Sequence, residues 1–78
     1  NIKLNATEFK LLHFFLTHQE KIYTRSQILD LVWGYNVVVS ERAVDVNIRR
    51  LRQKIEYLNY DKIIRSVRGS GYIFSPSQ

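Results

Sequence analysis

The segment from Arg42 to Lys54, RAVDVNIRRLRQK, constrains the fold of this chain most, because it predicts an α-helix with two opposed faces. Apolar side chains recur there at spacings of four and three residues, which is typical of one buried helix stripe. The stripe comprises Val44, Ile48, Leu51, Ile55 and Leu58. At ~100° per residue, the other side carries Arg42, Val46, Arg49 and Gln53, flanked by Asp45 and Arg50. A helix face with this excess of arginine over acid is suited to lying in a DNA groove.

The net charge is concentrated in the second half of the chain. The 78 residues include 12 Lys+Arg and 7 Asp+Glu, a formal net charge of +5. Residues 1–41 carry four bases and four acids, whereas residues 42–68 carry eight bases and three acids. This asymmetry indicates a polyanionic partner. The competing interpretation is an ordinary solvated face of a basic protein, although such a face normally interleaves more Glu with its Arg.

Size and composition exclude several classes of protein. A chain of 78 residues forms one small domain, and without cysteine it has no disulfide and no cysteine-based zinc site. No apolar run approaches the ~20 residues of a membrane span, so we expect no membrane partner and a cytoplasmic setting. His13 and His18 stand five residues apart on one helix, which is a poor spacing for shared metal ligation. We therefore expect no metal, no cofactor and no enzymatic activity.

The N-terminal third predicts a strand end followed by a very apolar helix. Ile2 to Leu4 alternates and is typical of the end of a strand. Asn5 to Glu8 forms a capping-box sequence, and the helix that follows runs to about His18. Apolar side chains cover most of the circumference of this helix. The basic helix can cover only part of it, so we expect another segment to pack on the side of Leu11 and Phe15.

A second, shorter helix is predicted after Thr24. Thr24 to Gln27 is another capping box, and Gly34 is a natural C-terminal stop. The inward side chains are expected to be Ile28, Leu29 and Val32. Ile22 and Tyr23 form either a small strand or a hydrophobic staple at the start of this helix. This short helix and the basic helix that follows it suggest a helix-turn-helix, in which the second helix is the basic one.

The second half of the chain predicts a capped helix and a hairpin. Ser40 is expected to cap the basic helix, with Glu41 in its first turn. After the pattern changes at residues 57–61, strand residues are expected at 63–67, a turn at 68–71 and a return strand at 72–74. Gly69 and Gly71 permit turn conformations that other residues avoid. The order predicts an α+β winged helix-turn-helix with three helices and a β-hairpin wing.

Five segments of the sequence together resemble the DNA-binding domains of OmpR/PhoB-type response regulators. They are TEFKLLHFFLTH, the residues from Arg25 to Leu29, VWG, RAVDVNIRRLRQKIE and SVRGSGYIF. The resemblance covers essentially the whole chain. It implies that residues 1–78 are the effector domain of a two-component transcription factor whose receiver domain is not in this chain. It also implies that the N-terminal four-stranded sheet of the family is largely absent.

The resemblance implies that the basic helix enters the major groove and that the wing reaches the minor groove. The implied DNA-binding residues are Arg42, Asp45, Val46, Asn47, Arg49, Arg50, Arg52, Ser66 and Arg68. Arg50 is expected to read a base edge, since Arg binds guanine O6 and N7 in a bidentate manner. Arg42 and Arg49 are expected to hold phosphates, which fixes the register without reading sequence.

Other residues of this set have more specific or open roles. Val46 is expected to touch a thymine methyl group, and Asp45 either accepts from cytosine N4 or orients a neighbouring Arg. Arg52 is equally suited to DNA contact and to an ion pair with Glu56 four residues on. Arg68 at the hairpin tip is expected to enter the minor groove, where A·T-rich DNA has enhanced negative potential. Tyr72 is expected to pack against the basic helix.

The loop from Trp33 to Val39 is a second candidate site. It holds apolar residues in a connection, and an exposed apolar patch there suits a protein partner. The resemblance implies contact with the sigma subunit of RNA polymerase through Trp33, Gly34, Val39 and Glu41. The alternative is that Trp33 and the valines only close the core. A second copy on tandem DNA sites is a further expected partner. The rival function is a protein-interaction winged helix, or a repressor.

Overall fold

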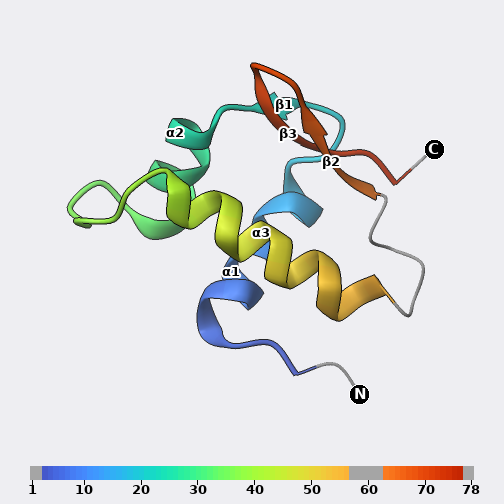
Figure 1. The fold of residues 1–78 in the computed structure, drawn as a ribbon, viewed down its shortest axis with the longest axis horizontal. Helices are drawn as coiled ribbons and strands as arrows, with labels where there is room; N and C mark the ends of the chain where they lie inside the picture. The colour runs from blue at the N-terminus through green and yellow to red at the C-terminus, as the bar shows by residue number, and fades with distance from the viewer. Residues whose placement is uncertain (1–2, 57–62, 77–78) are drawn as a thin grey trace.

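The computed structural model describes residues 3–56 and 63–76, and within them it has the winged-helix order that the sequence predicted. Figure 1 shows α3 running across the front of α1, with the strands gathered above them and α2 beside the strands. The elements are α1 (Ala6–Thr17), β1 (Ile22–Tyr23), α2 (Arg25–Ile28), the π-helical segment η1 (Leu29–Trp33), α3 (Arg42–Ile55), β2 (Ile64–Val67) and β3 (Gly71–Phe74). We call the hairpin of β2, its turn and β3 the wing.

Helix α1 begins at the predicted capping box. The Asn5 side chain accepts a hydrogen bond from the Glu8 N–H at 2.8 Å, and the Glu8 carboxylate accepts from the Asn5 N–H at 3.0 Å. These two bonds satisfy helix donors that otherwise have no partner. The helix ends at Thr17, with His18 as its C-cap, so its predicted bounds are confirmed.

The wing covers the side of α1 that carries Leu11 and Phe15. Leu11 and Phe15 are fully buried, so the expectation that another segment packs on their side is confirmed, and that segment belongs to this chain. Phe15 stacks on Phe74 of β3 at a centroid distance of 6.0 Å, which shows that the wing supplies the missing cover. The uncovered apolar side chains of α1 are Phe9 and Leu16, which are 62% and 50% exposed.

The second helix ends at Gly34, as predicted, but its second part is a π-helix instead of an α-helix. The side chain of Thr24 accepts from the Gln27 N–H at 3.0 Å, confirming the capping box. After α2 the chain widens into η1, and Gly34 ends it with φ of 100°. The Gly34 N–H donates to the carbonyls of Leu29 and Asp30, which is the closure of a helix by glycine.

Helix α3 buries the predicted stripe but lacks the predicted cap. Val44, Ile48, Leu51 and Ile55 are buried, whereas Leu58 lies outside the described residues. The N-cap is Glu41, and it makes no side-chain capping bond. The prediction that Ser40 caps this helix was therefore wrong. The Ser40 carbonyl instead accepts from the Ala43 N–H, so a backbone turn leads into the helix.

One core joins the helices and the sheet. Its buried hydrophobic residues are Leu11, Phe14, Phe15, Ile28, Val44, Ile48, Leu51, Ile55, Ile64, Tyr72 and Phe74. They come from α1, α2, α3 and the two wing strands, so the wing packs on the helices. Among the described residues, no helix is long and apolar enough to cross a membrane.

The sheet has the strand order β1-β3-β2 and is antiparallel throughout. Tyr72 of β3 lies opposite both Tyr23 of β1 and Ser66 of β2. Residues 22–23 are thus a strand, which resolves the alternative left open by the sequence. Ile63 precedes β2 instead of belonging to it.

At the N-terminus, Lys3 and Leu4 are in no strand, and Ile2 lies outside the described residues, so the predicted strand end is not present in the described part.

Candidate nucleic-acid interface

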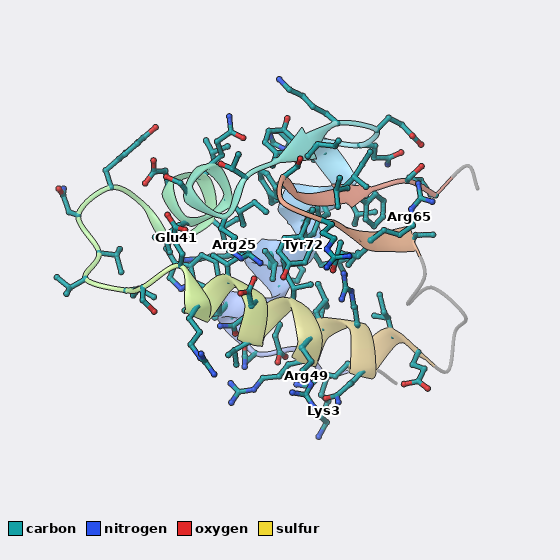
Figure 2. The ribbon with its side chains drawn as sticks, turned by 45° about the horizontal axis from the view of Figure 1, so that its top comes forward. Lys3, Arg25, Glu41, Arg49, Arg65 and Tyr72 are labelled. Carbon is teal, nitrogen blue, oxygen red and sulfur yellow. The ribbon has the colours of Figure 1, made fainter. Side chains whose placement is uncertain are left out.

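The outer face of α3, which we define as Arg42, Val46, Arg49 and Arg50, is open to solvent. All four residues are exposed, and Val46 at 37% exposure is an apolar side chain among the arginines. Shallow hollows run along this face, one beside Arg42 and Asp45 and the next beside Arg50 and Gln53. Figure 2 shows Arg49 on the side of α3 away from the sheet. Among the described residues, none of the three arginines donates a hydrogen bond or forms an ion pair.

On the flank of α3 that faces the wing, Asp45 accepts two side-chain hydrogen bonds. Its Oδ1 atom accepts a hydrogen bond from Arg25 Nε at 2.7 Å and another from the Tyr72 hydroxyl at 2.6 Å. Three elements, α2, α3 and β3, therefore meet at one carboxylate oxygen. Figure 2 shows Arg25 and Tyr72 in the space between these elements.

Burial and neighbouring groups shift the pKa values of both Asp45 and Tyr72. Burial alone raises the pKa of Asp45, but hydrogen bonds from Tyr72 and Arg25 and the charges of Arg25 and Arg42 lower it below 3.8. Burial first, and then the hydrogen bond and charge of Asp45, raise the pKa of Tyr72 above 10.0. Asp45 is thus held as the charged acceptor and Tyr72 as the neutral donor.

Arg52 is bound to the wing. Its Nε donates to the Ile64 carbonyl at 2.9 Å, and its Nη2 donates to the Ser66 hydroxyl at 3.0 Å. Its guanidinium also lies 5.5 Å from the centre of the Tyr72 ring. The sequence left Arg52 between an ion pair with Glu56 and DNA contact; the ion pair does not form, and the hydrogen bonds fix the guanidinium against β2. We call Arg25, Asp45, Arg52, Ser66 and Tyr72 the Asp45 junction.

Asn47 and Arg68, two further predicted DNA-binding residues, differ in exposure and in hydrogen bonding. Asn47 is half-buried, and its Nδ2 donates to the Ala43 carbonyl one turn earlier at 2.8 Å. Arg68 is exposed at the wing tip, where the Ser70 N–H donates to the Val67 carbonyl at 2.9 Å and closes the turn. Gly69 next to it has φ of 77°, a conformation that glycine adopts without strain. Arg68 is therefore held by a turn that leaves its side chain outside.

The loop from Trp33 to Val39 has features of both interpretations, a core anchor and a partner-binding surface. Trp33 is half-buried and packs against the core, as the core-anchor interpretation expects. Tyr35 is 79% exposed and Val38 is fully exposed, as a partner surface expects. Glu41, at the end of the following turn, is exposed too. Core closure and an exposed apolar patch therefore occur in one loop, on different residues.

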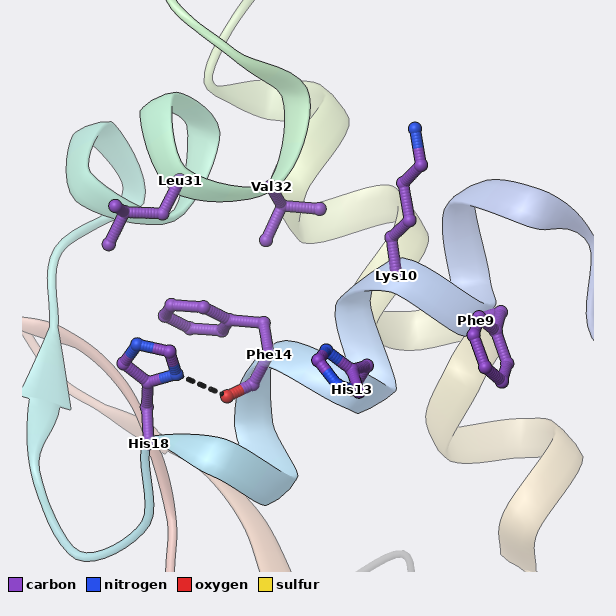
Figure 3. A pocket seen from close by; sticks show the side chains of 7 residues that line it. All are labelled: Phe9, Lys10, His13, Phe14, His18, Leu31 and Val32. Atoms are coloured by element: carbon purple, nitrogen blue, oxygen red, sulfur yellow. Dashed lines mark hydrogen bonds between the residues drawn. The ribbon is translucent and has the colours of Figure 1, made fainter.

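A separate hollow lies between α1 and η1 (Figure 3). It is lined by Phe9, Lys10, His13, Phe14, His18, Leu31 and Val32. His18 Nδ1 is bonded to the Phe14 carbonyl at 2.8 Å, and its ring stacks on Phe14. Within residues 3–56 and 63–76, no group of three or more His, Cys, Asp or Glu side chains could hold a metal ion. The hollow is thus an apolar groove whose inner histidine already has a partner.

Sequence reasoning missed Arg25 and Arg65 as candidate residues. Arg25 precedes Asp45 by 20 positions, so only the packing of α2 on α3 reveals their ion pair. Arg65 is exposed on β2, next to Ser66. One sequence signal for Arg25 was available. It directly follows the Thr24 cap, so it lies in the first turn of α2, the helix before α3.

Residues 1–74 match the model of the family described as "Transcriptional regulatory protein, C terminal". The chain is 54% identical over 74 residues to the phosphate regulon transcriptional regulatory protein PhoB of Klebsiella pneumoniae, and 55% identical over 73 residues to that of Pseudomonas aeruginosa. These alignments cover 95% and 94% of this chain but 32% and 31% of the relatives, so the chain spans about a third of their length. The segments LLHFFLTH, VWGYNVVV and DVNIRRLRQKIE predicted this closer resemblance to PhoB, which the identities confirm.

Solved structures agree with the sequence match. The DNA-binding domain of response regulator AdeR, in complex with an intercistronic region, superposes with a TM-score of 0.82 at 30% identity, covering 95% of this chain and 74% of that one. The Klebsiella pneumoniae RstA DNA-binding domain, in complex with the RstA box, gives 0.78 at 33% identity, covering 97% and 76%. The chain therefore belongs to the OmpR/PhoB-type C-terminal DNA-binding domains of transcriptional regulatory proteins.

Proposed function

We propose that residues 1–78 are the effector domain of a two-component response regulator whose receiver domain lies outside this chain. In this proposal α3 lies in the major groove and the wing reaches the adjacent minor groove. The family match makes the domain non-enzymatic, as the sequence predicted. The two relatives solved with DNA, AdeR and RstA, support double-stranded DNA as the partner.

The observation that carries the proposal is the division of the arginines. Arg25 and Arg52 are committed to hydrogen bonds inside the domain. Arg42, Arg49 and Arg50 are exposed on one face and make no such bonds within the described residues. A row of free guanidiniums on a rigid helix is what phosphate and guanine recognition requires, because each can donate two parallel hydrogen bonds.

Individual roles follow from this geometry. Arg50 reads a guanine edge, while Arg42 and Arg49 neutralise phosphates. Val46 supplies an apolar contact to a thymine methyl group. Arg68 enters the minor groove from the wing tip. The smaller contacts come from Asn47, whose amide oxygen is left to accept, and from Ser66 beside the fixed Arg52.

The relatives named for the phosphate regulon suggest the biological setting. We place the domain on promoters of phosphate-responsive genes, bound as two copies on tandem sites. The loop carrying Trp33, Gly34, Val39 and Glu41 then contacts the sigma subunit of RNA polymerase and activates transcription. The exposure of Tyr35 and Val38 beside these residues supports a protein-binding surface.

A repressor, the narrower alternative, uses the same DNA contacts as an activator. The exposed loop favours a different alternative function, a protein-interaction module. Such a module uses the loop and has no need of the outer face of α3. The free arginines of that face favour DNA binding. The two functions therefore predict different consequences of removing Arg50.

The test begins by selecting bound sequences from random duplexes, which returns the site and the spacing of its repeats. Arg50→Ala should then cost about 1–3 kcal/mol on the selected site and relax discrimination at one base pair. Arg42→Ala and Arg49→Ala should weaken selected and random duplexes alike, each lowering the salt slope by about one. Lys10→Ala, an exposed lysine of α1, is the control.

Two results would contradict DNA recognition by this face. One is an Arg50→Ala variant that binds selected and random duplexes with wild-type affinities. The other is an affinity of the wild-type chain that does not change with salt concentration. Either result would favour the protein-interaction module.

A further inference from the structure

The Asp45 junction connects the two parts of the domain that meet DNA in the proposed function. Asp45 and Arg52 are seven residues apart on α3, so they project from the same side of the helix, two turns apart. Both point to the wing. Asp45 accepts from the Tyr72 hydroxyl of β3, and Arg52 donates to the Ile64 carbonyl and Ser66 hydroxyl of β2.

The wing receives these bonds at adjoining places. Tyr72 and Ser66 are cross-strand partners, so Asp45 and Arg52 form hydrogen bonds with neighbouring positions of one sheet. Tyr72 is 6% exposed, and its ring lies 5.5 Å from Arg52 and 5.9 Å from Arg25. Hydrogen bonds have strict lengths and directions, unlike apolar packing, so they fix the position of the wing along α3.

We propose that Tyr72 and Asp45 are positioning residues that hold the wing at a set distance from α3, so that Arg68 and the outer face of α3 engage DNA together. This inference rests on the proposed function. It predicts that breaking the Tyr72–Asp45 bond weakens DNA binding chiefly by losing the contribution of Arg68, because a misplaced wing no longer reaches its groove while α3 is bound.

A double-mutant cycle measures this coupling directly. Dissociation constants for the selected duplex are compared for the wild-type chain, Tyr72→Phe, Arg68→Ala and the double variant. We expect about tenfold weaker binding for each single variant and about tenfold, not hundredfold, for the double variant. Tyr23→Phe is the matched control, since Tyr23 lies opposite Tyr72 and its hydroxyl donates to no described residue.

A second measurement reports the position of the wing without DNA. The chain has no cysteine, so spin labels at Gln53→Cys on α3 and Ser70→Cys at the wing tip report a single distance. We expect a narrow distance distribution that broadens with Tyr72→Phe. Asp45→Asn, which keeps an acceptor oxygen, should broaden it less than Asp45→Ala. Circular dichroism confirms that each variant is folded.

The outcomes separate this inference from the proposed function. If the wild-type chain does not prefer the selected duplex, the proposed function fails. If it does, wild-type affinity of Arg68→Ala overturns the positioning role. Additive effects in the cycle overturn it too, because a direct contact of the Tyr72 hydroxyl with DNA adds to the loss of Arg68. A distance distribution that Tyr72→Phe and Asp45→Ala leave unchanged overturns it as well.

Discussion

Lys54 of α3 donates a hydrogen bond from its Nζ to Oε1 of Glu8 at 2.6 Å, so the acid that caps α1 also anchors α3. Glu8 is 1% exposed, which makes this a buried carboxylate with a half-exposed ammonium partner. The capping box alone explains why a glutamate occupies position 8. The ion pair with Lys54, 46 residues later in the chain, also compensates the charge of this buried glutamate.

Lys54→Met should lower the free energy of unfolding by about 1–3 kcal/mol, because it leaves a buried charged acceptor without its strongest donor. Methionine keeps the aliphatic stem, so the loss reports the ammonium and not the packing. Urea denaturation followed by circular dichroism measures it. Lys10→Met, at an exposed lysine of α1, should change the stability by less than about 0.5 kcal/mol. Equal effects of the two substitutions contradict the anchoring role.

Stability should fall with acidification. Burial raises the pKa of Glu8, but the hydrogen bonds from Lys54 and Asn5 and the charges of Lys54 and Arg50 lower it below 4.5. A group with a lowered pKa in the folded state contributes stability above its unfolded pKa, and this is lost as the pH falls through the folded pKa. The same sign holds for Asp45. Urea midpoints at about pH 6, 4 and 3 should decrease, and Lys54→Met should flatten the profile. A flat wild-type profile contradicts both assignments.

Gly71→Ala should destabilise the domain far more than Gly69→Ala. At Gly71 φ is 135°, and an added Cβ collides with the Tyr23 carbonyl of β1. At Gly69 φ is 77°, and nothing lies within 4 Å of an added Cβ. We expect a loss of about 1 kcal/mol at Gly69 from backbone strain alone, and about 3 kcal/mol or more at Gly71, where β1 must also move. Thermal unfolding of both variants checks this, and similar losses would exclude the close approach of β1.

The loop prediction concerns transcription and not folding. In the full-length regulator, Val38→Ser and Glu41→Gln should change stability by less than about 0.5 kcal/mol, since both side chains are exposed. Promoter binding should be unchanged, while transcripts from a reconstituted polymerase should fall severalfold. Trp33→Ala should instead cost about 1–3 kcal/mol, because Trp33 packs on the core. Wild-type transcript levels with both exposed-site variants defeat the sigma-contact proposal.

Local rules accounted for most of the fold. Both capping boxes, the Gly34 stop and the stripe of α3 depend on residues within one or two turns of each other, and all are confirmed for the described residues. Where local signals competed, the prediction failed. Ser40 has the chemistry of a cap, yet the backbone turn through Glu41 starts the helix instead.

Of the long-range contacts, the packing of Tyr72 on the basic helix was predicted and is confirmed, but the strand pairing and the ion pairs were not. The pairing of β1 with β3 joins residues about 50 positions apart, and the stacking of Phe15 of α1 on Phe74 of β3 joins residues about 60 positions apart. The arginines of α3 show the same limit. Helical spacing placed Arg42, Arg49 and Arg50 on an outward face, which the structure exposes. Arg25, which pairs with Asp45, and Ser66, which pairs with Arg52, come from other elements, so spacing along one helix carries no information about them.

The Asp45 junction also restricts how the specificity of this fold can be redesigned. Its members lie on α2, α3, β2 and β3, so a helix transplanted alone from another regulator arrives without the partners that its own flank requires. Substitutions limited to Val46, Arg49 and Arg50 leave every hydrogen bond of the junction in place. New operators are therefore reached most safely by rewriting one face of α3, while a grafted helix must keep Asp and Arg at positions 45 and 52 to pair with Arg25, Ser66 and Tyr72.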